Sequence, residues 1–304
     1  MTIISTPGLH GGPPATGLRR PVLPAAAVAA LGAGIALTAL LGPLVSDLMR
    51  YRTSPTTLNQ LLGSDAAGLF VIAPLAVVAA VLVFRRPVAG LLLASGIGAF
   101  AVYTYLQVIV GQEYLRLPGN VERFFPLLLA VFVLAEATFV LAWRAVPTDL
   151  PPVSRRLELA AGGALLAVVV FLVFGQHLRP MLLAWSDPAS LTEYASSPTP
   201  FWLVKLMDLG IVVPIAAITG IGLLRRAAWA RRVAYPLLTA YALLGVSVTA
   251  MGVVMSLHAD PDAAPGLTVG FLVFTAIFAG LAAALYRPLL RRPTADPGER
   301  HASG

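Results

Sequence analysis

The sequence contains no cysteine, and a single lysine is found among its 304 residues. Without cysteine, disulfide bonds, cysteine-ligated zinc, iron–sulfur clusters and thiol catalysis are excluded. Charged residues make up 12% of the chain, about half the share of a soluble domain. The sequence also lacks a phosphate-binding glycine loop, a serine nucleophile elbow and an HExxH zinc motif. We therefore expect no cofactor, and the sequence favours a protein that is not an enzyme.

Hydrophobic residues, in contrast, make up 58% of the chain, and the mean hydropathy is +0.84. The apolar residues gather in runs of about 20, the length needed for a helix to cross a hydrocarbon layer. The runs lie at about 22–45, 66–84, 88–110, 124–143, 157–175, 201–224, 233–257 and 267–286. None alternates with a period of two, as a barrel strand would. We expect an all-α, polytopic membrane bundle of about eight transmembrane helices in a lipid bilayer.

The positions of the arginines predict the orientation of this bundle. Fifteen arginines fall on the side of the N-terminus, and five fall in the loops on the other side: Arg50, Arg52, Arg116, Arg123 and Arg179. Cytoplasmic loops are enriched in basic residues, so both termini should be cytoplasmic, in a bacterial-type plasma (inner) membrane. The same placement accounts for the net charge of +7 without a nucleic-acid partner.

Two similar patterns of proline and arginine suggest an internal repeat. Pro74 precedes Arg85–Arg86 by eleven residues, and Pro214 precedes Arg225–Arg226 by the same eleven, at an offset of 140. The alternative is chance, because membrane helices commonly contain a proline and end in arginine pairs. If the repeat is real, an even number of spans makes the two copies parallel, and a cavity can form at their interface.

The repeat leads to a predicted domain organisation. In chain order, we expect a disordered cytoplasmic tail at 1–22, four-helix repeats at 23–147 and 155–290, and a second disordered tail at 291–304. Within the repeats, Ser54–Pro55 is matched with Asp187–Pro188, each as the start of a short outer helix.

Glu136 is one candidate for a substrate or proton site. It lies twelve residues after Phe124, where the fourth run begins. At 1.5 Å per residue this is roughly 18 Å, slightly past the bilayer centre. Its helical neighbours are apolar, so a carboxylate here would be costly to ionise and should hold a proton near neutral pH. The alternative is a protonated glutamate that stabilises a helix contact by hydrogen bonding.

Lys205 and Asp208 in the sixth run are further candidates. Their spacing of three residues puts them on one helical face. Pro214 cannot donate to the carbonyl of Gly210, so a free acceptor is expected near Asp208. A loosened helix with a carboxylate and a free carbonyl is typical of binding sites in transporters. The alternative is a lysine that extends toward the interface and is neutralised by Asp208.

Tyr103 and Gln107 complete the candidate binding residues, because they form a polar stripe in the third run that continues to Tyr114. This stripe could line a pathway or join helices by hydrogen bonds. Met251 and Met255, with His258 and His177 at span ends, would suit copper(I), but methionine is common in helix cores. The sequence therefore predicts no metal site.

Our first functional hypothesis is transporter-like binding and movement of a small molecule or ion. The second is a non-catalytic membrane scaffold, sensor or assembly subunit, supported by the few polar residues and by long outer loops at 46–65 and 176–200. An intramembrane enzyme is a third alternative, with one isolated carboxyl as its support. The sequence indicates neither the ligand nor an oligomeric state.

Overall fold

The computed structural model describes residues 22–290, and every regular element in this range is a helix. Eight helical runs are long and apolar enough to cross a membrane, which confirms the predicted all-α, multi-pass membrane bundle. They are α1 (Val22–Leu41), α2–η1–α3 (Pro55–Ala67, Gly68–Ile72, Ala73–Arg85), α4 (Pro87–Val110), η2–α5 (Val121–Phe124, Phe125–Ala145), α6–η3–α7 (Arg155–Val170, Phe171–His177, Leu178–Ser186), α9–η5–α10 (Pro198–Met207, Asp208–Val212, Val213–Leu224), α11 (Ala228–Leu257) and α12 (Pro265–Leu290). The short helices η4 (Pro188–Ser190) and α8 (Thr192–Ser196) join the fifth and sixth runs.

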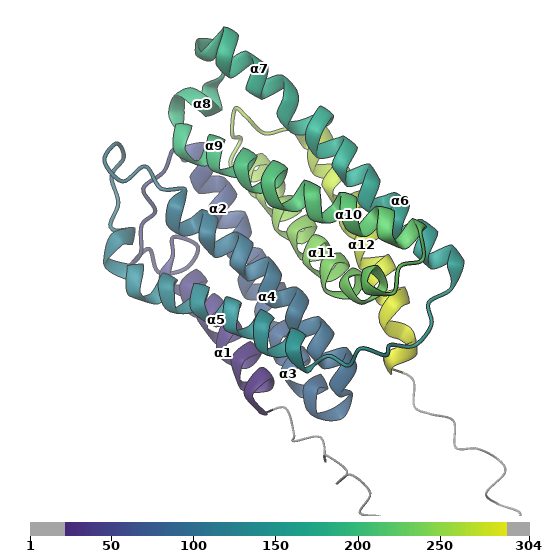
Figure 1. The fold of residues 1–304 in the computed structure, drawn as a ribbon. Coiled ribbons are helices and arrows are strands. Elements are labelled where there is room, and N and C mark those ends of the chain that lie inside the picture. Colours follow the sequence, from purple (N-terminus) through teal and green to yellow (C-terminus); the bar gives the residue numbers. More distant parts are fainter. Residues whose placement is uncertain (1–21, 291–304) are drawn as a thin grey trace, which may run out of the picture.

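The helices pack as two groups that meet along α11. In the first group α1 and α4 both pack against α3 and α5, and in the second α6 packs against α10 and α11 against α12. Helix α11 also packs against α2 and α4 of the first group. Figure 1 shows the two groups side by side, with the first and last described helices, α1 and α12, entering and leaving at one end. We call this the terminal end and the opposite end the loop end.

Three of the eight runs contain a π-helical segment, in which the backbone bonds i to i+5. These are η1 in the second run, η3 in the fifth and η5 in the sixth. Both η1 and η5 end directly before an α-helix whose second residue is proline, Pro74 or Pro214. Proline has no N–H to donate, so a local change of register at these points is expected.

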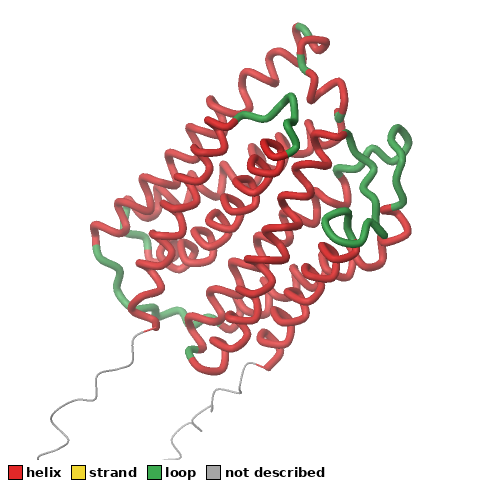
Figure 2. The backbone as a smooth tube through the Cα atoms, turned by 180° about the vertical axis from the view of Figure 1, so that it is seen from behind, coloured by secondary structure: helices red, strands yellow, loops and turns green. Residues whose placement is uncertain are grey.

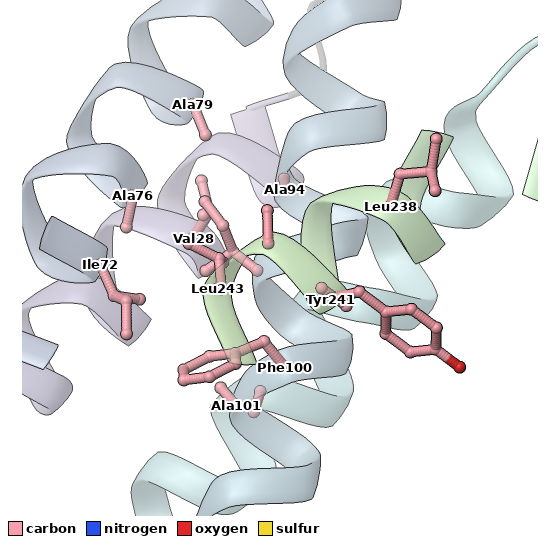
Figure 3. Close-up of a cluster of buried hydrophobic side chains, with 14 of the residues drawn as sticks. Val28, Ile72, Ala76, Ala79, Ala94, Phe100, Ala101, Leu238, Tyr241 and Leu243 are labelled. Atoms are coloured by element: carbon pink, nitrogen blue, oxygen red, sulfur yellow. The ribbon is translucent and has the colours of Figure 1, made fainter. Parts of the chain in front are cut away.

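Small residues allow the helices to approach closely. A Cβ atom at Gly96 of α4 would lie 2.5 Å from Cβ of Thr239 in α11, and one at Gly98 would lie 2.7 Å from the backbone nitrogen of Phe139 in α5. Figure 3 shows alanines of α3 and α4 facing the same buried cluster, while the ring of Tyr241 points away from it. Close backbone packing of this kind is how membrane helices associate without a strong hydrophobic driving force.

At the loop end the segments 42–54 and 111–120 are joined by hydrogen bonds. The amide of Glu113 donates to the Arg52 carbonyl (2.8 Å), and the amide of Arg52 donates to Oε1 of Gln112 (2.7 Å). The Arg52 guanidinium also forms an ion pair with Glu122 at 2.6 Å. Figure 2 shows these segments among the loops gathered at the loop end. The loop end of the first group is therefore a well-connected surface.

The structure changes two details of the sequence-based picture. The second run begins before its apolar stretch, so helix α2 covers part of the predicted outer loop 46–65. The fifth run ends after its apolar stretch, so helix α7 covers part of the predicted outer loop 176–200. Asp187–Pro188 starts the short helix η4, as expected, whereas Ser54–Pro55 starts a spanning run, and the sixth run also begins with a Ser–Pro pair, Ser197–Pro198. The predicted tails at 1–22 and 291–304 lie outside the described residues, apart from Val22, which begins α1. The division into repeats at 23–147 and 155–290 stays a prediction.

Candidate binding cavity and its acidic centre

A cavity of about 600 Å³ lies between the two helix groups. Its wall comes from α2, α4, α9, α11, α12 and the π segments η3 and η5, so both groups contribute. At the loop end it is lined by Thr192, Glu193 and Asp262. Toward the terminal end its last lining residues are Tyr241 and Phe274, beyond which Phe278 and Leu238 are buried. The cavity therefore extends from the loop end to about the middle of the bundle and is closed toward the terminal end.

Asp208 is the acidic centre of this cavity. Its Oδ1 atom accepts a hydrogen bond from the hydroxyl of Tyr103, and its Oδ2 atom lies 2.8 Å from Nε2 of His177. His177 is buried, with 6% of its surface exposed, although it ends an apolar run in the sequence. Asp208 lies eleven residues beyond the N-cap Ser197, roughly 16 Å along a helical run of 27 residues and so near the middle of that run.

The π segments place these side chains toward one another. Asp208 is the first residue of η5, and His177 is the last residue of η3. A π segment inserts one extra residue per turn and rotates the following side chains relative to a regular α-helix. Tyr241 of α11 contacts the same region, because its hydroxyl donates to the carbonyl of Val212 at the end of η5 (2.8 Å). The interruption in the sixth run thus coincides with the polar centre of the cavity.

The charge of the cavity wall is acidic, although the protein as a whole is basic. The wall contains the carboxylates of Asp208, Glu193 and Asp262 and the imidazole of His177. None of the described residues that line the cavity is lysine or arginine. Aromatic rings also face the cavity, from Tyr103, Tyr241, Phe171, Phe271 and Phe274. Carboxylates and aromatic faces both attract cations.

The predicted candidates separate into two sets. Tyr103, Gln107 and Asp208 all line the cavity. Lys205 and Gly210 do not. The Lys205 ammonium donates to the Phe201 carbonyl (3.3 Å) and lies 3.2 Å from the centre of the Phe201 ring. Among the described residues Lys205 forms no ion pair, so the expected local pairing with Asp208 is absent from the described part of the chain.

Glu136 lies away from the cavity. It is exposed on the outward face of α5, on the same side as Leu129, Val133 and Val140. Its carboxyl group forms no hydrogen bond or ion pair with another residue within 22–290. The sequence indicated its depth, but the direction of its side chain depends on which face of α5 packs against α1 and α4.

The sequence places His177 at a span end, and the structure shows that its side chain is buried. Its only sequence signal was a histidine at the end of an apolar run. Met251 and Met255 line the cavity, whereas Nδ1 of His258 lies 2.6 Å from Oδ1 of Asn59 at the loop end. Within the described range, no three histidine, aspartate or glutamate side chains gather as a metal site would require.

In comparisons with known proteins, no family model matches this chain, and no curated protein or solved structure is significantly similar to it.

Proposed function

We propose that this integral membrane protein binds a small organic cation in the cavity, with Asp208 as the counter-ion, and moves it across the membrane. The observation that carries the proposal is the acidic cavity wall, which contains three carboxylates and no lysine or arginine among the described residues. A volume of about 600 Å³ is within the usual range for small-molecule sites. The aromatic side chains around Asp208 would stabilise a substituted ammonium group by cation–π contacts.

The proposal includes a direction of access. The arginine distribution favours a cytoplasmic terminal end, so the loop end would face outside. The cavity reaches the loop end and is closed on the terminal side of Tyr241 and Phe274. This arrangement supports entry of the ligand from outside.

The π segments support movement rather than binding alone. Interrupted helices that meet at a midplane site are the elements that rearrange in many secondary transporters. Asp208 and His177 belong to two such segments and contact each other. A change in either segment would therefore alter the coordination of the ligand directly.

The test begins with purified protein and a panel of small primary, tertiary and quaternary amines, each paired with an alcohol and a carboxylate of similar shape. The amines should raise the melting temperature and their matched alcohols and carboxylates should not. Asp208→Asn should weaken binding of an active amine about tenfold or more, because a charge-assisted contact is lost. Asp149→Asn, on the exposed loop at the terminal end, is the matched control.

Proteoliposomes then separate the two functional hypotheses. Uptake of a radiolabelled active amine that Asp208→Asn abolishes would support transport. Binding without uptake would favour the sensor or scaffold alternative. Equal binding of amines and carboxylates would refute the proposed selectivity.

A further inference from the structure

A second, smaller cavity surrounds Asp65 in α2. Its volume is about 20 Å³, which is room for one water-sized occupant. The residues in its wall that carry a side-chain oxygen are Asp65, Thr38, Tyr51, Ser64, Thr104 and Tyr105. The Tyr51 hydroxyl lies 3.0 Å and 3.3 Å from the two carboxylate oxygens of Asp65. The wall thus includes one residue with a carboxyl group and five with a hydroxyl group.

The charge of Asp65 has no cationic partner within the described chain. None of the ion pairs among residues 22–290 involves Asp65, and the titratable groups that face it, Tyr51 and Tyr105, are neutral at physiological pH. A carboxylate in a membrane protein interior is costly unless another charge compensates it. Hydroxyl and carboxylate oxygens are the ligands that hard cations prefer.

The absence of a side chain at Gly42 leaves space for the Asp65 carboxylate. A Cβ atom at Gly42, directly after α1, would lie 3.0 Å from Oδ2 of Asp65, so a larger residue would crowd the carboxylate. The cavity is also lined by Gly68 and Ile72, the first and last residues of η1. The site therefore lies beside the interruption of the second run, as the Asp208 site lies beside that of the sixth.

The Asp65 site resembles the Asp208 site in further respects. Each aspartate lies eleven residues after the serine that precedes its spanning helix, Ser54 or Ser197. Each accepts a hydrogen bond from a tyrosine hydroxyl, and the two serines are themselves joined by a hydrogen bond of 2.8 Å. The two carboxylates should therefore lie at similar depths in the bilayer.

The two cavities share a wall. Ser64, Thr104 and Val108 line both of them. The hydroxyl of Ser64 also forms a hydrogen bond of 3.0 Å with Ser247 of α11, which lines the large cavity. An ion at Asp65 and a ligand beside α4 and α11 would thus both contact the wall that Ser64 helps to form.

We propose that the small cavity binds one sodium ion, held by the Asp65 carboxylate and the surrounding hydroxyl oxygens, and that this ion is coupled to the ligand in the large cavity. Sodium binding stands independently of the proposed function, whereas the coupling rests on it. Bound sodium fixes Ser64 and Thr104 and so orders the shared wall. Sodium therefore raises the affinity of the large cavity for its cationic ligand.

The experiment measures binding of radioactive sodium to the purified full-length protein, with potassium chloride keeping the ionic strength constant so that no organic cation is present. The wild type should bind one sodium ion per chain in competition with unlabelled sodium. Asp65→Asn should abolish this binding, and Tyr51→Phe, which keeps the carboxylate, should weaken it about tenfold. Asp208→Asn should retain it, and so should Asp47→Asn, which removes an exposed aspartate of the loop end.

Melting curves provide the second readout. Sodium should raise the melting temperature of the wild type and of Asp208→Asn, by about 3 °C at ten times the Kd and further with the logarithm of the sodium concentration. If Asp65→Asn does not fold, the weakened binding of Tyr51→Phe carries the test. Unaltered sodium binding in a folded Asp65→Asn protein, or no sodium binding by the wild type, overturns the proposal. Stability that responds to pH and not to sodium also overturns it and assigns Asp65 to a proton.

The coupling arm measures amine affinity with and without sodium. A rise of about tenfold or more in wild type that needs about ten times more sodium in Tyr51→Phe supports coupling. Sodium binding without any amine binding would refute the proposed function and leave the sodium site intact. Amine binding without sodium binding would refute the sodium site alone.

Discussion

Gly63 controls the closest approach between the two helix groups. A Cβ atom at this position would lie 2.4 Å from both the Cα and the nitrogen of Met251 and 2.6 Å from the carbonyl carbon of Ala250. Carbon atoms in favourable contact are about 3.5–4.0 Å apart, so Gly63→Ala forces α2 and α11 to separate by about 1 Å. Helix α11 cannot simply move away, since it also packs against α4 and α12. Overpacking of this kind costs about 1–3 kcal/mol.

The assay is thermal unfolding followed by intrinsic tryptophan fluorescence in one detergent. At roughly 2–4 °C per kcal/mol, Gly63→Ala should lower the melting temperature by about 2–12 °C. Gly270→Ala on α12 is the control, because no atom lies within 4 Å of a Cβ there and alanine is the better helix former by about 1 kcal/mol. A Gly63→Ala protein that melts at or above the wild-type temperature would refute the described crossing of α2 and α11.

Three further predictions follow from the placement of charged side chains. Glu136→Gln should leave amine affinity within about twofold of wild type, because the residue lies on the outward face of α5; a tenfold loss would return Glu136 to the mechanism. Burial alone raises the pKa of Asp260, but hydrogen bonds from Asn59, the Asp262 amide and Thr56 outweigh it and lower the pKa below 3.8. The stability that Asp260 contributes is therefore present above pH 3.8 and lost as the pH falls through the lowered pKa. The difference in melting temperature between wild type and Asp260→Asn should shrink over that pH range. A difference that does not change with pH would contradict this. Thiol reagents that cannot cross the membrane should label Thr53→Cys and Ala195→Cys in intact cells and Ala228→Cys only after permeabilisation, and the reverse pattern would invert the proposed orientation.

The number of spans was predictable because hydropathy reports which surfaces face lipid. The same measure missed the first turns of the second run, from Pro55 onward. Thr56, Gln60 and Ser64 are polar because they line the large cavity, not because they lie in a loop. Polarity therefore reported a cavity wall at a place where hydropathy alone suggests a loop.

The candidate site was only partly predictable. Asp208 and Tyr103 stood out as polar residues inside apolar runs, and the structure brings them together. The pairing of Asp208 with His177 depends on how the fifth and sixth runs pack and on two π segments, and no local pattern encodes either. Lys205 contacts Phe201, one turn earlier on its own helix, rather than Asp208. Spacing of three residues permits an ion pair but does not require one.

An acidic cavity that opens at the loop end and selects cations can be detected without knowing the ligand. Since the sequence has no cysteine, Val248→Cys places a single thiol in the cavity wall, and Leu115→Cys places one on the fully exposed loop. Each is reacted with a trimethylammonium methanethiosulfonate and with its sulfonate counterpart, and the ratio of the two rates is compared. We expect the ratio at position 248 to exceed the ratio at position 115 by about tenfold or more and to fall when Asp208→Asn is added. Equal ratios at the two positions, or faster reaction of the sulfonate at position 248, would contradict it.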